Sequence, residues 1–76
     1  MQTMLNAIKA CDTLMSEGSI SEYIPAYAEL TYVFNAGLTV RIADHGNGLY
    51  QATLNGFIAL EPATPDALIA YLVNLD

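Results

Sequence analysis

The stretch that decides the fold is residues 50–72, YQATLNGFIALEPATPDALIAYL. Asn55-Gly56 favours a type I′ turn, because both central residues of that turn need positive φ. On either side, apolar and polar residues alternate with the period of a β-strand. The stretch therefore predicts a hairpin in which residues 50–54 pair with residues 57–61.

A helix should follow this hairpin. The side chain of Thr64 can cap an N-terminal amide, and Pro65 suits the first helical position, where no amide hydrogen is needed. Asp66 lies in the first turn, where the helix dipole favours an anion. The helix should run from Pro65 to about Asn74, with a central apolar stripe widened by further hydrophobic residues: Leu68, Leu72 and Leu75, then Ile69, Tyr71 and Val73.

Two more strands are predicted upstream, because residues 30–34 and 38–42 also alternate with period two. The turn between them contains Gly37, which can adopt positive φ. Residues 44–48, DHGNG, predict a flexible turn that leads into the strand at residues 50–54.

The N-terminal region predicts a single helix over residues 3–16. Its apolar stripe comprises Met4, Leu5, Ile8, Cys11 and Met15. Gly18 is expected to stop the helix in the left-handed conformation.

Residues 19–29 allow two interpretations. Ser21 can cap a short helix with Pro25 in its first turn, and we take a short helix or an irregular turn as the prediction. The alternative is an extended segment up to Ile24 followed by a loop, since a residue before proline is biased away from the α-helical region.

Together these elements predict an α+β fold with an N-terminal helix, a four-stranded antiparallel meander and a C-terminal helix, in two layers. The 76 residues predict a single domain over residues 1–76. The residues are 54% hydrophobic and 13% charged, and so small a domain cannot bury all of that apolar surface. We therefore expect a homodimer or a standing partner. The apolar surface of the last helix that does not cover the sheet should pack on the first helix or on a second copy of the chain.

The charge is strongly acidic, with eight acids, two bases and a net charge of −6. This charge repels phosphate backbones, so direct binding to nucleic acid is not expected. It attracts basic protein surfaces instead.

A lone cysteine, Cys11, rules out an intramolecular disulfide and fits a reducing cytoplasm. The first residues, MQTMLNAIKA, do not resemble a signal peptide, and no apolar run is long enough to predict a membrane span.

Residues for catalysis are scarce. His45 is the only histidine, and we interpret it as a solvated turn residue, with Cys11 as an inert thiol on the helix stripe. DHGNG lacks the further acids of a calcium loop, and neither a dinucleotide-binding nor a P-loop motif occurs. We therefore expect no enzyme activity, metal or cofactor.

The predicted partner-binding residues lie in the irregular segment: Glu17, Glu22, Tyr23, Tyr27 and Glu29. Binding residues are often carried on irregular segments, and tyrosines are favoured at interfaces. The alternative is that Tyr32 packs in the core while Tyr23 and Tyr27 shield the edge of the core.

Residues 48–72, GLYQATLNGFIALEPATPDALIAYL, resemble the strand–strand–helix unit of HicB-type antitoxins, with its GxYxA strand and TPxxAL helix start. The chain departs from that family in its tight Asn55-Gly56 turn, and we expect no DNA-binding extension after the helix. The resemblance implies a subunit that binds and masks a toxin.

By type, the short acidic chain is similar to the phage-encoded anti-CRISPR inhibitors, which share no motif. That resemblance implies a stoichiometric inhibitor of a basic, nucleic-acid-handling protein. The implied target is a CRISPR effector complex in the cytoplasm of the host cell. We take it as the first functional hypothesis, the antitoxin-like subunit as the second, and a small ligand carrier or enzyme as the third.

Overall fold

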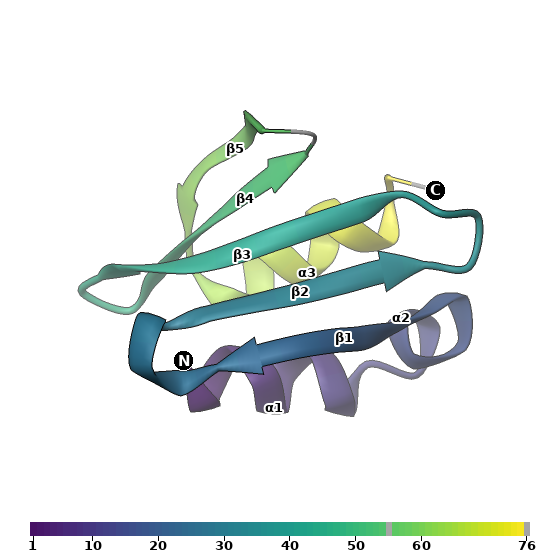
Figure 1. The fold of residues 1–76 in the computed structure, drawn as a ribbon, viewed down its shortest axis with the longest axis horizontal. Helices are drawn as coiled ribbons and strands as arrows, with labels where there is room; N and C mark the ends of the chain where they lie inside the picture. Colours follow the sequence, from purple (N-terminus) through teal and green to yellow (C-terminus); the bar gives the residue numbers. More distant parts are fainter. Residues whose placement is uncertain (55, 76) are drawn as a thin grey trace.

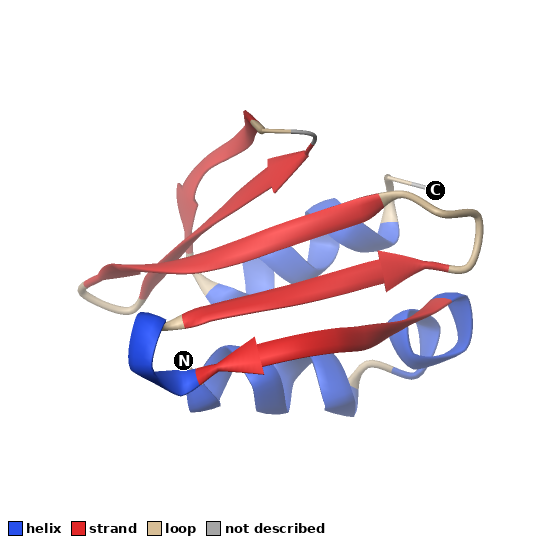
Figure 2. Ribbon diagram, viewed as in Figure 1, coloured by secondary structure: helices blue, strands red, loops and turns tan. Residues whose placement is uncertain are grey.

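The computed structural model describes residues 1–54 and 56–75 and has two layers, an antiparallel sheet and a layer of helices (Figure 1). The elements occur in the following order: α1 (Gln2–Ala10), α2 (Asp12–Glu17), β1 (Gly18–Ile24), the 3-10 turn η1 (Pro25–Tyr27), β2 (Glu29–Phe34), β3 (Thr39–Gly46), β4 (Leu49–Leu54), β5 (Phe57–Ala63) and α3 (Pro65–Val73). The strands lie side by side in chain order from β1 to β5. Figures 1 and 2 show the helices behind the sheet, so its other face is open. The α+β class and the antiparallel meander are confirmed.

The predicted strand count was wrong, because residues 18–24 form β1 and pair with β2. The alternative of an extended segment up to Ile24 was correct, and the short helix is present only as the 3-10 turn at residues 25–27. A bulge between Ile20 and Glu22 explains the error. It inserts one residue, so the inward positions are Ile20 and Tyr23 and the period-two pattern is interrupted.

The predicted single N-terminal helix was also wrong, because the chain breaks into α1 and α2 at Cys11. Cys11 has an extended backbone, with φ −92° and ψ 104°, and its carbonyl accepts the first hydrogen bond of α2 from the Met15 amide. The break changes the phase of the second helix. Leu14 is consequently buried, whereas Met15, which we placed on the apolar stripe, is 43% exposed.

The turns and α3 largely follow the predictions. Gly37 has φ +103° in the β2–β3 turn, and Leu54 pairs with Phe57 in the β4–β5 hairpin. Gly56 has φ +84°, while the conformation of Asn55 lies outside the described residues. The Oγ1 atom of Thr64 accepts a hydrogen bond from the Ala67 amide, so the predicted cap of α3 is confirmed.

The DHGNG segment is only partly a turn. β3 extends through Gly46, and the tight turn is Asn47-Gly48, with φ +56° and +75°. Asn47 and Gly48 suit this turn, because asparagine and glycine tolerate positive φ.

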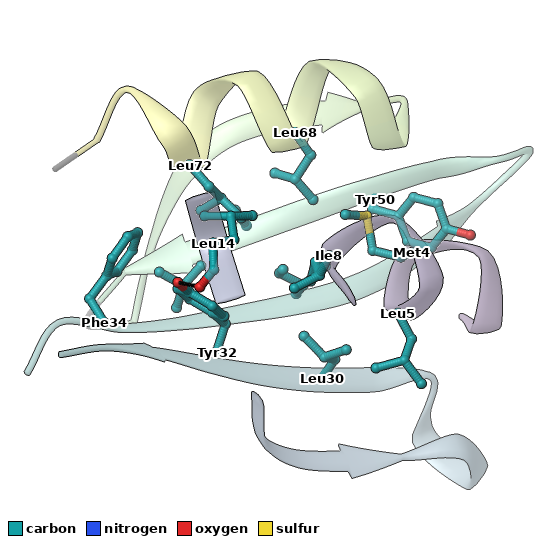
Figure 3. Packing of buried hydrophobic residues seen from close by; sticks show 13 residues of the cluster. Met4, Leu5, Ile8, Leu14, Leu30, Tyr32, Phe34, Tyr50, Leu68 and Leu72 are labelled. Atoms are coloured by element: carbon teal, nitrogen blue, oxygen red, sulfur yellow. Dashed lines mark hydrogen bonds between the residues drawn. The ribbon is translucent and has the colours of Figure 1, made fainter. Parts of the chain in front are cut away.

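The core lies between the helices and the inner face of the sheet (Figure 3). Its buried residues come from α1, α2, β2, β3, β4 and α3: Met4, Leu5, Ile8, Leu14, Leu30, Tyr32, Phe34, Val40, Ile42, Tyr50, Ala52, Leu68 and Leu72. The rings of Tyr32 and Phe34 meet edge to face with centroids 4.9 Å apart. The Tyr32 hydroxyl donates a hydrogen bond to the Leu14 carbonyl, which ties β2 to α2 inside the core.

Candidate functional site

The candidate site is built on the hairpin of β1 and β2, whose connection is closed by η1. Pro25 occupies the first position of η1, where its missing amide hydrogen costs no hydrogen bond. Ala28 follows in the left-handed conformation at φ +51°, and its amide donates to the Pro25 carbonyl at 3.1 Å. The Ala28 carbonyl in turn accepts from the Asp44 amide on β3 at 3.0 Å. The connection is therefore held by backbone hydrogen bonds at both ends.

Glu22 and Glu29 lie on the open face of the sheet. Glu22 is paired with Thr31 and Glu29 with Ile24, so the two carboxylates are diagonal neighbours across β1 and β2. Diagonal neighbours in a sheet have Cα atoms about 7–8 Å apart. No cation among the described residues forms a salt bridge with either carboxylate. We call Glu22, Glu29 and the neighbouring Tyr27 the acidic surface.

The two tyrosines of the predicted site lie in different environments. Tyr27, in η1, is 74% exposed. Tyr23 pairs with the inward-facing Leu30 and packs half-buried against the core. Tyr27 therefore lies in the connection, two residues before Glu29, and Tyr23 lies on the helix side of β1.

Glu17 lies apart from the acidic surface. It ends α2, and its carbonyl accepts a hydrogen bond from the Asn35 amide at 2.7 Å, next to the turn between β2 and β3. Because Gly18 pairs with Phe34 and Ile24 with Glu29, Glu17 is at the opposite end of the hairpin from Glu29. The seven residues of β1 separate these ends by roughly 20 Å. Glu17 also lines a concavity with residues of α2, β2 and α3: Thr13, Leu14, Phe34, Leu72 and Val73.

Arg41 is a surface residue that our sequence-based site omitted. It lies at the centre of the open face, directly opposite Thr31 on β2 and Thr53 on β4. Together with Thr39, Thr53 and Gly56 it lines a shallow concavity. The signal was available in the sequence, because the period-two pattern places Arg41 and these threonines on the face opposite the core.

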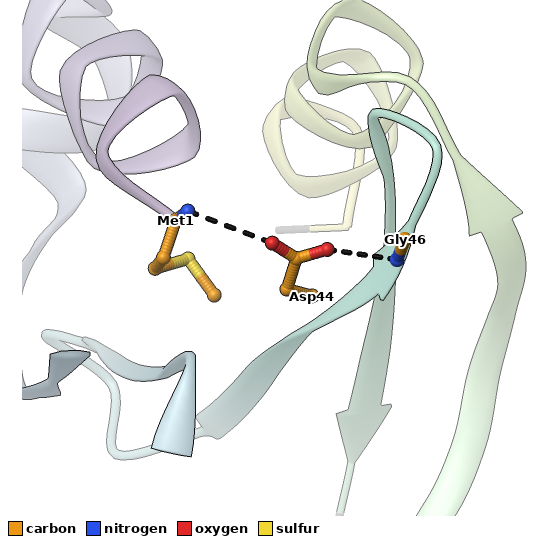
Figure 4. A network of polar contacts seen from close by, with 3 residues as sticks. All are labelled: Met1, Asp44 and Gly46. Atoms are coloured by element: carbon orange, nitrogen blue, oxygen red, sulfur yellow. Dashed lines mark hydrogen bonds and ion pairs between the residues drawn. The ribbon is translucent and has the colours of Figure 1, made fainter. Parts of the chain in front are cut away.

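Asp44 is engaged in local structure rather than in a catalytic arrangement (Figure 4). One carboxylate oxygen lies 3.6 Å from the amino group of Met1, and the other accepts a hydrogen bond from the Gly46 amide at 2.8 Å. The neighbouring His45 is exposed, and Cys11 is half-buried at the helix break. Within residues 1–54 and 56–75, no three His, Cys, Asp or Glu side chains converge in a way that could hold a metal ion.

None of the described helices has the length and apolarity needed to cross a lipid bilayer. No protein-family model, curated protein or solved structure matches the chain.

Proposed function

We propose that the protein is a non-enzymatic binding protein that engages a basic surface of a nucleic-acid-handling protein and inhibits it stoichiometrically. The observation that carries this proposal is the acidic surface: two carboxylates that form no salt bridge among the described residues, with the 74% exposed Tyr27 in the adjoining connection. Arg41 is a diagonal neighbour of Glu29 on the same face. The acidic surface is complementary in charge to arginines and lysines that normally bind a phosphate backbone. Such rim charges accelerate encounter and select the partner more than they raise affinity.

The net charge of −6 supports the same assignment of partner. It repels DNA and RNA directly, so the protein would compete with nucleic acid for the basic surface rather than bind the nucleic acid. We propose a CRISPR effector complex as the target class, in keeping with the anti-CRISPR inhibitors that the chain resembles in size and charge.

The test is a target-DNA cleavage assay with purified CRISPR effector complexes loaded with guide RNA. We expect the parent protein to abolish cleavage at about one equivalent per binding site, and the variant Glu22→Lys/Glu29→Lys to need at least about tenfold more protein, since attraction becomes repulsion. Asp12→Lys/Asp66→Lys is the matched control, because it makes the same charge change on exposed residues at the starts of α2 and α3. Circular dichroism confirms the folding of each variant.

Three outcomes are informative. Equal inhibition by the parent and by folded Glu22→Lys/Glu29→Lys contradicts the acidic surface. Equal loss in both charge variants means that net charge alone drives the effect. Absence of inhibition across the effector classes rejects this target.

A second candidate is an antitoxin-like subunit, and one observation favours it. Residues 48–72 fold as β4, β5 and α3, the strand–strand–helix order that the HicB resemblance implies. Co-expression with toxins of HicB-type pairs is its test, with recovery of host growth as the expected result.

A further inference from the structure

The two edges of the sheet differ in how well they are protected from pairing with another strand. β1 carries a bulge at Ser21, a charge at Glu22 and the proline that ends it, Pro25. Bulges, charges and prolines are the devices by which natural proteins block an edge. The β1 edge is therefore blocked from Ser21 onward, after three regularly paired residues, Gly18–Ile20.

The edge formed by β5 carries a bulge at Ala59, and charge and proline block it only in its second half. Glu61 and Pro62 block that half, because proline has no amide hydrogen to donate. The first half, residues 57–60, has no charged or proline residue and begins with two large apolar side chains, Phe57 at 78% and Ile58 at 64% exposed. No described strand lies beyond β5. We call residues 57–60 the open edge.

The exposed apolar side chains of the open edge point to opposite sides of the sheet. Phe57 is paired with Leu54, whose neighbour on β3 is the buried Val40, so Phe57 is on the helix side. Ile58 is paired with Thr53, on the open face. A partner that lies on either face would cover only one of them, whereas a strand added alongside β5 covers both and also pairs the free backbone groups.

We propose that the open edge pairs with the open edge of a second copy of the chain, in antiparallel orientation. Charge selects this occupant: residues 46–60 form the longest stretch of the chain without an acid or a base. A second copy also carries a net charge of −6, so two copies can approach with least repulsion here, whereas a basic partner is drawn to the acidic surface.

Symmetry and the blocked edges determine the size of the assembly. Antiparallel pairing of identical strands is a twofold, self-complementary contact that closes on itself. The bulge at Ala59 and the blocked residues Glu61 and Pro62 keep the pairing short. Because the β1 edge of each copy is blocked from Ser21 onward, we expect growth to stop at a dimer with one continuous sheet.

The helix α3 packs against α1, which is one of the two predicted possibilities, and it is less suitable as a dimer contact. Its large apolar residues are buried or packed against the core, and its exposed positions are small or polar: Asp66, Ala67, Ala70 and Asn74.

The dimer has a consequence that rests on the proposed function. β1 and β5 are opposite edges of the sheet, so the two acidic surfaces would lie at the far ends of the dimer. Such a dimer is bivalent and gains avidity on any target that presents two basic sites at a matching distance. The dimer itself does not depend on the target and is tested without it.

Sedimentation equilibrium of the protein alone, from about 1 µM to 1 mM, is the test. We expect a concentration-dependent dimer in the parent protein and at least a tenfold higher dissociation constant for Ile58→Lys. Met15→Lys is the matched control, because it places the same charge on another exposed apolar residue, in α2, and should leave the dimer unchanged. Both lysines reduce the net negative charge, so weaker association of Ile58→Lys alone reports the open edge and not general repulsion.

Hydrogen exchange supplies a second measurement. Amides in residues 57–60 should exchange more slowly as the concentration of the parent protein rises. A parent that is monomeric at 1 mM overturns the proposal, and so does a dimer that Ile58→Lys leaves intact while that variant remains folded by circular dichroism.

Discussion

At the scale of single residues, Gly18 shows a requirement that comes from its neighbours and not from its own backbone. Its φ of −176° is extended and accessible to any residue. A Cβ atom at this position would, however, lie 2.7 Å from the hydroxyl oxygen of Tyr32 and would collide with the carbonyl oxygen of Val33. The Tyr32 side chain cannot easily move away to make room, because its hydroxyl donates a hydrogen bond to the Leu14 carbonyl.

Gly18→Ala should therefore lower the free energy of unfolding by about 1–3 kcal/mol, the usual cost of overpacking a closely packed site. Urea unfolding monitored by circular dichroism measures it. The control Ser19→Ala changes an exposed neighbour on the same strand and should stay within about 0.5 kcal/mol of the parent. Identical midpoints for Gly18→Ala and the parent would mean that β1 moves away from β2 at no cost.

At the scale of elements, the start of α3 is held by local chemistry. Thr64 has an extended backbone, its Oγ1 accepts from the Ala67 amide at 3.3 Å, and Pro65 begins the helix. The cap satisfies one of the amides that an α-helix leaves unpaired at its N-terminus. The helix then places Leu68 and Leu72 over the sheet (Figure 3), so the cap also orients part of the core.

Removal of the cap by Thr64→Ala should cost about 1 kcal/mol of stability. Thermal and urea unfolding provide the measurement, with Thr13→Ala as the control, since Thr13 is exposed within α2 and caps no helix. If both variants unfold at the same midpoint, the Thr64 side chain contributes no net stabilisation.

At the scale of the whole molecule, the acids repel one another across the entire structure. The principal dimensions are 30 × 25 × 22 Å, and the net charge is −6. At about 0.01 M ionic strength the Debye length is about 30 Å, so the charges act over the full width of the protein. At physiological ionic strength it falls to about 8 Å, and distant charges are screened.

The melting temperature should consequently rise when NaCl is increased from about 0.01 M to about 0.15 M, because self-repulsion destabilises the compact state. Differential scanning calorimetry measures the shift. Glu22→Lys/Glu29→Lys carries less net negative charge and should show a smaller rise. A melting temperature that falls with salt in the parent would indicate that attractive ion pairs outweigh the repulsion.

The sequence by itself determined the elements whose signals are local. The period-two runs of β2, β3 and β4, the β4–β5 hairpin and the Thr64-Pro65 helix start depend on residues close together in the chain, so pattern and turn chemistry predicted them. The acidic character follows from composition, and the predicted binding segment contains Glu22 and Glu29, which share the open face of the sheet.

Only the tertiary structure decided the features that depend on distant residues. The bulge in β1 exists only in the pairing of β1 with β2, and it interrupts the period-two pattern of the strand. The break at Cys11 directs Leu14, rather than Met15, into the core. The same pairing separated Glu17 from Glu29 and left Phe57 and Ile58 on a free edge. Spacing along a chain gives the face of a residue within one element, whereas its neighbours across elements depend on strand order and register, which no local pattern contains.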